Sequence, residues 1–205
     1  MNSRLSLPIT ILQRGLILVI VPFLIQATFA WLVADIQQRQ TMAYEQSLKT
    51  KDVLVQARQA LTLLLDEESA MRGYVITGDP AFNEPYELAS QQLPDVLRRL
   101  QLLVADDPGP LAAVKSIAGK SLTLFNWHTK TVRNMRDGAA EAAVAAVKGG
   151  EGKRQMDALR ADFNNFIEQT ELASQVRQAS LLEAQTRLRA FVIANTILGF
   201  VVMIT

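Results

Sequence analysis

Residues 66 to 88 contain the end of one predicted helix, a tight turn and the start of a second helix. In the turn Thr77-Gly78-Asp79-Pro80, Gly78 is suited to ending the first helix, because glycine readily takes the left-handed conformation that closes a helix. Asp79 is suited to capping the second helix, and Pro80 to its first position. The segment therefore predicts a hairpin of two helices.

Helical periodicity dominates residues 35 to 189, and no run of alternating apolar and polar residues flanked by hairpin turns indicates a strand. Four main helices are expected: one continuing from the N-terminal segment to about Ile76, and others over Pro80 to about Val104, Leu111 to about Arg136, and Lys153 onward. Short connections favour an all-α, up-down-up-down four-helix bundle as the ectodomain between two transmembrane helices.

Turn residues predict the connections between these helices, and the spacing of apolar residues predicts which positions form the core. Asp106 to Pro110 predicts a turn, Ala139 to Val147 an Ala-rich turn, and Gly149 to Gly152 the end of that connection. Apolar side chains at helical spacing predict the core positions, which are Leu93, Val96, Leu97, Leu100 and Leu103 in the second helix, Val114, Ile117, Leu122, Leu124, Phe125 and Val132 in the third, and Met156, Leu159, Phe163, Phe166, Thr170 and Ala173 in the last.

No charged residue occurs from Gly15 to Ala34, and most side chains in this run are apolar. Such a run has the length of about 20 residues that a helix needs to cross about 30 Å of hydrocarbon. Trp31 suits the boundary between membrane and water. The alternative, a cleaved signal peptide, would have a shorter apolar region, and no small-residue cleavage pattern is evident. Residues 15–34 are predicted to form a transmembrane helix.

The C-terminal residues 190–205 are also uncharged and apolar, but the run is shorter than the about 20 residues of a complete span. A terminal carboxylate inside the bilayer is unfavourable because a charge there is costly. We therefore expect residues 190–205 to be a truncated second transmembrane helix of a longer protein.

The charged residues predict the orientation. Arg4 and Arg14 are the charged side chains of residues 1–14, and positive charge marks the cytoplasmic side, so this segment is expected to be a cytoplasmic tail. Residues 35–189 then lie outside. Their acidic and basic side chains nearly balance, which gives no basic field for nucleic acid.

The hairpin segment resembles the CHASE3 family of extracytoplasmic bacterial sensor domains. The residues that carry the resemblance are Glu68, Arg72, Gly73, Tyr74, Thr77, Gly78, Phe82, Pro85 and Tyr86. A second similar stretch is Gly150-Glu151-Gly152-Lys153-Arg154, followed by Met156 to Arg160. The resemblance covers about residues 40 to 185.

The resemblance implies a sensor and signal-transmission module in a bacterial inner-membrane receptor, with a periplasmic domain over residues 35–189. Members of the family are commonly joined to histidine kinase, diguanylate cyclase or chemoreceptor outputs. A sensor histidine kinase whose output domain is absent from this chain is the first expectation. The alternatives are one of the other two outputs, or a membrane-tethered periplasmic interaction protein without an output domain.

Two groups in the signature are candidates for binding a ligand or for switching. Glu68 and Arg72 are four residues apart, so they are neighbours on a helix and can pair. They could bind a zwitterionic or anionic small molecule, or they could be an ion pair that fixes helix register. Tyr74, Phe82 and Tyr86 could form an aromatic pocket, or they could cap the core with each phenol hydrogen-bonded.

The remaining polar clusters predict no catalytic, metal or cofactor site. Adjacent helical residues do not converge, so Asp66-Glu67-Glu68 is predicted to be a solvated face. His128 is the single histidine and the chain has no cysteine, which is a poor basis for a metal site. Residues 149–154 lack the Gly-Lys-Ser/Thr ending of a phosphate loop, and no Ser-His-Asp set is present, so no enzymatic activity is expected of this chain.

Helix lengths predict a two-helix stalk near the membrane. The first and last helices span roughly 60 Å outside the membrane and the two middle helices about 40 Å, at 1.5 Å per residue. The stalk is rich in glutamine, at Gln37, Gln38, Gln40, Gln46, Gln175, Gln178 and Gln185. Because two helices with so little apolar surface associate weakly, a homodimer is expected.

Overall fold

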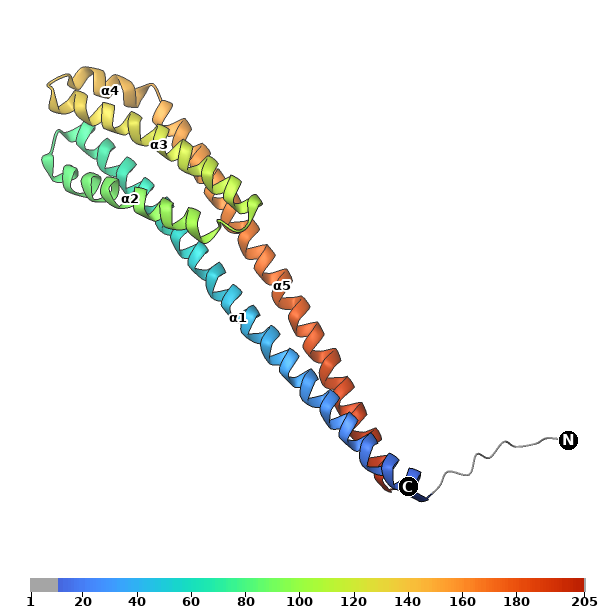
Figure 1. The fold of residues 1–205 in the computed structure, drawn as a ribbon. Helices are drawn as coiled ribbons and strands as arrows, with labels where there is room; N and C mark the ends of the chain where they lie inside the picture. The colour runs from blue at the N-terminus through green and yellow to red at the C-terminus, as the bar shows by residue number, and fades with distance from the viewer. Residues whose placement is uncertain (1–10, 205) are drawn as a thin grey trace. The chain divides into compact units, whose positions relative to one another are not determined.

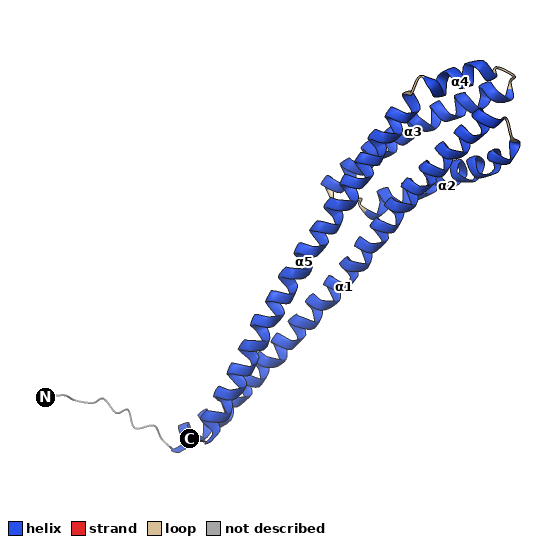
Figure 2. Ribbon diagram, turned by 180° about the vertical axis from the view of Figure 1, so that it is seen from behind, coloured by secondary structure: helices blue, strands red, loops and turns tan. Residues whose placement is uncertain are grey.

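The computed structural model describes residues 11–204, and of residues 11–14, 17, 18, 21, 22, 25, 188 and 195–204 it describes the backbone alone. The elements in chain order are α1 (Ile11–Thr77), the short 3₁₀ helix η1 (Pro80–Phe82), α2 (Asn83–Leu103), α3 (Pro108–Arg136), α4 (Ala140–Lys148) and α5 (Glu151–Ile204). All secondary structure in this described range is helical (Figure 2). The all-α prediction is confirmed.

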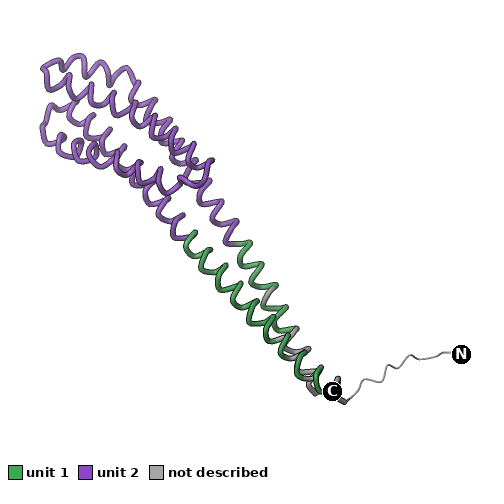
Figure 3. Tube along the Cα trace, viewed as in Figure 1, with its two compact units in different colours: residues 1–46, 179–205 green, residues 47–178 purple. Residues whose placement is uncertain are grey.

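The chain divides into two compact units (Figure 3). One contains the described residues up to Gln46 and those from Ala179 onward, and the other is Ser47–Gln178. The second unit holds α2, α3, α4 and the adjoining parts of α1 and α5 (Figure 1). Its long helices form the predicted four-helix bundle.

Each of the four long helices contributes apolar side chains to one continuous core in the second unit. The fully buried residues include Leu64 of α1, Leu100 of α2, Leu124 of α3 and Phe163 of α5. Most of the predicted core positions are buried, but Leu122 is 59 % exposed and Ala173 is also exposed. The helical periodicity therefore identified the buried faces with errors at single positions.

A second apolar cluster is built from α1, α2, α3 and α4. Its buried members are Ala70, Met71, Val75, Tyr86, Val132 and Ala143. Residues 139–147, predicted to be a turn, instead contribute α4. Alanine has the highest intrinsic helix propensity, and α4 is stabilised by burying Ala143 in this cluster.

The helix boundaries differ slightly from the predicted ones. The turn predicted at Asp106 to Pro110 is shorter, because α3 already begins at Pro108 with Asp107 as its N-cap. Proline suits that position, where its missing N–H has no partner in the helix. At the other end of α3, Gly138 has a φ of 80° and allows the chain to turn into α4.

Ion pairs at the surface join the helices of the second unit. Lys49 lies 2.9 Å from Asp106, Lys120 lies 2.6 Å from Asp162, and Arg136 lies 2.8 Å from Glu87; Arg58 and Glu171 also pair. The Lys49 hydrogen bond lowers the pKa of the Asp106 carboxyl below its usual value. Exposed pairs of this kind contribute about 0–1 kcal/mol each, so the bundle rests mainly on its apolar core.

None of the helices, taken over their described residues, contains a stretch that is long and apolar enough to cross a membrane. Residues 1–10 of the predicted cytoplasmic tail lie outside the described range, as does Thr205 at the end of the predicted second span. The side chains of several residues within both predicted spans lie outside it as well.

Candidate sensory site at the α1–α2 hairpin

Hydrogen bonds around Thr77 and Gly78 end α1. The Thr77 hydroxyl donates to the carbonyl of Gly73 at 2.7 Å and accepts from the backbone N–H of Asp79 at 3.1 Å. Gly78 has a φ of 70°, a left-handed conformation that favours glycine, and its N–H donates to the carbonyl of Tyr74 at 2.8 Å. These two signature residues therefore close the helix.

Asp79 and Pro80 start the next helical turn. The Asp79 carboxylate accepts a hydrogen bond from the N–H of Ala81 at 2.9 Å, which makes Asp79 the N-cap of η1. Pro80 occupies the first position of that helix, as the sequence predicted. The turn residues thus have local structural roles that require no ligand.

Phe82 packs directly on Gly73. A Cβ atom at Gly73 would lie 2.4 Å from Cδ1 of the Phe82 ring, which is far inside van der Waals contact. The absence of a side chain at Gly73 allows the ring to cover the end of α1. A similar contact occurs at the start of α5, where a Cβ at Gly152 would lie 2.4 Å from the Trp127 ring. Both glycine-containing sequence motifs therefore mark close packing against an aromatic ring.

Replacing Gly73 by alanine is expected to destabilise the bundle by about 1–3 kcal/mol, the usual effect of overpacking, because the added methyl group displaces Phe82. Gly119→Ala is the matched control: that glycine is exposed within α3 and a Cβ there meets nothing within 4 Å. The control should be stabilised by up to about 1 kcal/mol through helix propensity. The measurement is the thermal unfolding midpoint of each variant, followed by circular dichroism. Equal midpoints for Gly73→Ala and Gly119→Ala would contradict the close contact between Gly73 and Phe82.

Glu68 and Arg72 form the predicted ion pair on α1. The Arg72 Nη1 and Glu68 Oε1 atoms are 3.5 Å apart; the Glu68 side chain is 11 % exposed and that of Arg72 is 44 % exposed. Arg72 also acts across the bundle on Asp157 of α5. The pKa of Asp157 is lowered chiefly by the hydrogen bond from Lys153, and to a smaller extent by the charges of Arg160 and Arg72. The half-exposed Arg72 guanidinium remains accessible to an anion.

Tyr86 is buried, with 7 % of its surface exposed, and its hydroxyl lies 3.2 Å from the Thr129 hydroxyl of α3. Burial raises the pKa of Tyr86 above the usual value of about 10, the charge of Glu67 adds to this, and the Thr129 hydrogen bond partly offsets it. The prediction that this phenol finds a hydrogen bond at the end of the core is confirmed. Tyr74 and Phe82 are partly buried and Pro85 is exposed.

In alkaline titration followed by ultraviolet absorbance, the Tyr86 phenol is expected to ionise above pH 10. Because its pKa is raised in the folded state, Tyr86 contributes stability that is fully present below about pH 10 and lost as pH rises through the folded value. The difference between wild type and Tyr86→Phe isolates this phenol. Ionisation at or below pH 10 in that difference spectrum would contradict the account.

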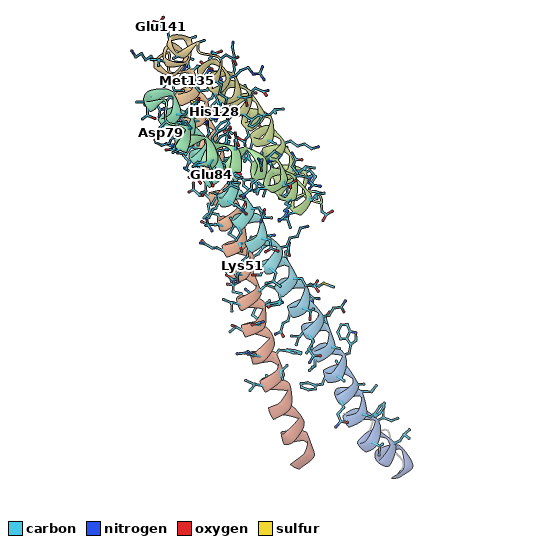
Figure 4. All side chains as sticks on the ribbon, turned by 90° about the vertical axis from the view of Figure 1, so that its left-hand side faces the viewer. Lys51, Asp79, Glu84, His128, Met135 and Glu141 are labelled. Atoms are coloured by element: carbon cyan, nitrogen blue, oxygen red, sulfur yellow. The ribbon has the colours of Figure 1, made fainter. Side chains whose placement is uncertain are left out.

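Sequence reasoning missed a buried pair beside this hairpin. Glu67 and His128 are both fully buried, and their Oε1 and Nδ1 atoms are 3.2 Å apart. Figure 4 labels His128 among the helices of the second unit. The prediction that residues 66–68 form a solvated face is wrong for Glu67 and Glu68, although Asp66 is exposed. The signal was present in the spacing, because Glu67 continues the buried stripe of Ala60 and Leu64 toward Met71.

Among the described residues, no group of three or more His, Asp or Glu side chains is placed to hold a metal ion. What the hairpin brings together is the Glu68–Arg72 pair, the Gly73–Phe82 contact and the buried phenol of Tyr86. The Gly73–Phe82 contact holds η1 against the end of α1, and the Tyr86 hydroxyl joins α2 to Thr129 of α3, whereas the Glu68–Arg72 pair lies within α1. A ligand that displaced Phe82 would therefore act on helix packing.

Comparison with known proteins agrees with this arrangement. The family model for the CHASE3 domain matches residues 43–180, which is more than half of the chain. The chain belongs to the CHASE3 family. The family resemblance predicted from the signature residues is thus confirmed, and membership of a family of extracytoplasmic sensor domains supports a sensory role.

A search of curated proteins finds no match to this CHASE3 chain. Among solved structures, the crystal structure of the Rhodopseudomonas palustris histidine kinase HK9 sensor domain is similar, with a TM-score of 0.51 and 18 % sequence identity. The similarity covers 65 % of this chain and 98 % of that one. At this identity the comparison establishes a shared fold.

Proposed function

We propose that this chain is the extracytoplasmic sensor and transmembrane signal-transmission module of a bacterial sensor histidine kinase. The observation that carries the proposal is the CHASE3 match over residues 43–180, which begins within α1 and ends within α5. Both helices continue beyond the matched residues toward the apolar ends of the sequence. A change in the packing of either helix within the CHASE3 domain could therefore pass along a continuous helical backbone.

The membrane attachment is part of this proposal and rests on the sequence. Residues 15–34 and 190–205 are uncharged, and Arg4 and Arg14 mark the cytoplasmic side. Residues 1–14 would then be a cytoplasmic tail, and residues 35–189 would lie in the periplasm of a cell with an inner membrane. Trp31, which is 69 % exposed, would lie near the outer boundary of the first span.

A histidine kinase output is favoured by the shared fold with the HK9 sensor domain, which belongs to a histidine kinase. The test is to read the gene beyond the codon for Thr205 and to assay the full-length protein in membranes for autophosphorylation from ATP. We expect a helical linker that leads into a kinase domain. A diguanylate cyclase or chemoreceptor domain, or the absence of any output domain, would contradict the kinase assignment.

The stimulus would act by binding two arrangements of the bundle with different affinity, since a ligand with equal affinity for both shifts nothing. The hairpin is our candidate for that contact because Arg72 is half-exposed beside the nearly buried Glu68 carboxylate. The ligand class that fits is an anionic or zwitterionic small molecule, or an acidic group on a periplasmic protein. The same residues also have structural roles, so binding there would be coupled to the packing of the hairpin.

A homodimer is the proposed assembly, and exposed apolar side chains of the second unit support it. Leu48 and Val55 are 43 % and 55 % exposed and lie seven residues apart on α1; Leu172 and Val176 are 52 % and 69 % exposed and lie four apart on α5. Apolar residues at these spacings form a stripe on each helix that a second copy could cover.

The chain has no cysteine, so an introduced cysteine is its single thiol. If the stripe is the interface, Val176→Cys on α5 should form a cross-linked dimer in membranes, and the exposed α3 control Lys115→Cys should not. Equal cross-linking would contradict the interface.

A further inference from the structure

A groove lies between α1 and α5 within the first unit, which is drawn in green in Figure 3. Its volume is about 330 Å³, at the lower end of the range of small-molecule sites. Both helices contribute to its lining, which consists of Ile36, Gln40, Gln185, Arg189, Val192 and Ile193. All six residues lie outside the CHASE3 match over residues 43–180, so the groove is a feature separate from the hairpin.

The lining of this groove changes from polar to apolar along the two helices. Gln40 and Gln185 line the end that is nearer in sequence to the second unit. Ile36 and Val192 line the end that is nearer to the two uncharged runs of the sequence. Arg189 lies on α5 between these two ends. The groove is therefore amphipathic along its length, with a cation at its middle.

Arg189 has no ion-pair partner among the described residues. The other two cations whose side chains are described in the first unit are each paired on their own helix. The Nε atom of Arg39 lies 2.8 Å from an Asp35 carboxylate oxygen, and the Nη2 atom of Arg187 lies 3.6 Å from one of Glu183. These two pairs carry no net charge, so the charge of Arg189 is left without a counter-charge.

The remaining acidic side chain described in the first unit is too distant to neutralise Arg189. Glu45 lies nine residues beyond Ile36 on α1, which is about 13 Å along the helix at 1.5 Å per residue. Ile36 and Arg189 line the same groove, so they lie at a similar level. The groove therefore has a net positive charge.

A molecule that matches both features is an amphiphile with an anionic head. A phosphate group suits Arg189, because a guanidinium can donate two parallel hydrogen bonds to it. The amides of Gln40 and Gln185 can add hydrogen bonds at the polar end of the groove. Ile36 and Val192 offer apolar surface to a hydrocarbon chain at the other end. An anionic phospholipid combines these groups in one molecule.

The place of the groove in the proposed membrane arrangement agrees with such a ligand. Arg189 directly precedes the uncharged run 190–205, and Ile36 follows the run 15–34 by two positions. Both residues would then lie at the outer boundary of the membrane, at the level of the lipid headgroups. A lipid with its phosphate on Arg189 and its chain directed past Ile36 would have the same orientation as its neighbours in the bilayer.

We propose that the groove between α1 and α5 binds one anionic phospholipid, with the phosphate on Arg189 and an acyl chain along Ile36, Val192 and Ile193. The inference rests on the membrane attachment that is part of the proposed function. The bound lipid contacts both helices, so it joins α1 to α5 at the membrane boundary.

Native mass spectrometry of the full 205-residue chain in dodecyl maltoside micelles tests the lipid preference. The micelles receive equal amounts of phosphatidylglycerol and phosphatidylcholine with the same acyl chains. We expect about fivefold more bound phosphatidylglycerol, the factor that one arginine contributes near anionic lipid. Arg189→Gln should reduce this ratio to about one. Arg187→Gln is the matched control and should keep the ratio, because Arg187 is already paired with Glu183.

The apolar end of the groove has its own pair of variants. Ile36→Ser should lower the amount of bound phosphatidylglycerol at least about fourfold, the factor for one buried methylene group. Met42→Ser changes an exposed residue of α1 outside the groove and should leave that amount unchanged.

Several outcomes would overturn the proposal. They are equal binding of the two lipids to the wild type, a preference that Arg189→Gln retains, and equal losses in the Arg189 and Arg187 variants. An unchanged amount of bound lipid in Ile36→Ser would also overturn it. A groove covered by a second copy would instead give a dimer that binds no anionic lipid and that Ile36→Ser dissociates, which would overturn it as well.

Membrane attachment is measured separately, by alkaline carbonate extraction of membranes from cells that contain the full chain. Retention in the membrane pellet without a lipid preference in micelles would overturn the lipid site and leave the proposed function intact. Retention together with the expected preference supports both. Release into the supernatant would contradict the membrane attachment and, with it, the lipid site.

Discussion

Replacing His128 by leucine is expected to destabilise the bundle by about 3–5 kcal/mol, because the Glu67 carboxylate then stays buried without its partner. Glu67→Leu should have a similar effect by leaving His128 alone in the core. The double variant should be far less destabilised than the sum of the two, since apolar side chains can replace a buried pair at little net loss. Denaturant unfolding of the full chain in micelles measures all three.

The coupling between the two substitutions distinguishes a buried pair from two independent core residues. Residues in direct contact show interaction energies of about 0.5–3 kcal/mol in double-mutant cycles. Glu84→Gln, at an exposed position of α2, serves as the surface control and should change stability by less than about 0.5 kcal/mol. Single substitutions that each have less than about 1 kcal/mol of effect, with an additive double variant, would contradict the contact between Glu67 and His128.

Phe163→Ala is expected to destabilise the bundle by about 3–5 kcal/mol, the usual range for a large aromatic residue removed from a core. Phe163 is fully buried on α5 in the core shared by all four long helices. Its loss leaves a cavity whose lining loses contacts with the ring. The free energy of unfolding from denaturant titration is the measurement.

Leu172→Ala provides the comparison on the same helix. Leu172 is 52 % exposed, so its truncation should change the stability of a single copy by no more than about 0.5 kcal/mol. If the proposed homodimer forms through this face, Leu172→Ala should instead weaken association. Equal losses of stability for Phe163→Ala and Leu172→Ala would show that α5 does not pack as described.

Much of the fold was predictable because its signals are local. The Gly78-Asp79-Pro80 turn determines where α1 ends and the next helix begins, and the helical spacing of Leu93, Val96 and Leu100 identified the buried face of α2. Helix connections are short, so consecutive long helices pack as neighbours. The turn prediction for α4 is wrong because the flanking Gly138 and Gly149 are typical turn residues, whereas the alanine-rich segment between them favours a helix.

The candidate site was predicted in part. The spacing of four residues between Glu68 and Arg72 correctly indicated an ion pair on one face of α1. Packing of Phe82 on Gly73 could not be read from the sequence, because it depends on the angle at which the chain leaves the turn. The motif thus identified the residues, and the structure supplied their contacts.

Local spacing indicates the burial of Glu67 but not its pairing with His128. The two residues are 61 positions apart, and a charged residue is usually assigned to the surface because burying it unpaired is costly. Only the packing of α1 against α3 brings them together. The helical register places Glu67 in line with Leu64 and Met71 and so indicates that Glu67 is buried. It does not indicate which residue of another helix pairs with Glu67.

Labelling of single cysteines in intact cells tests the central claim, an extracytoplasmic bundle held at a membrane, most directly. The chain has no cysteine of its own, so Lys115→Cys on the exposed face of α3 and Ser6→Cys in the predicted tail each give one reactive site. The account predicts that a membrane-impermeant maleimide, small enough to pass the outer membrane, labels Lys115→Cys in intact cells. It predicts that Ser6→Cys is labelled only after the cells are opened. Protection of Lys115→Cys until lysis, or equal labelling of both sites in intact cells, would contradict it.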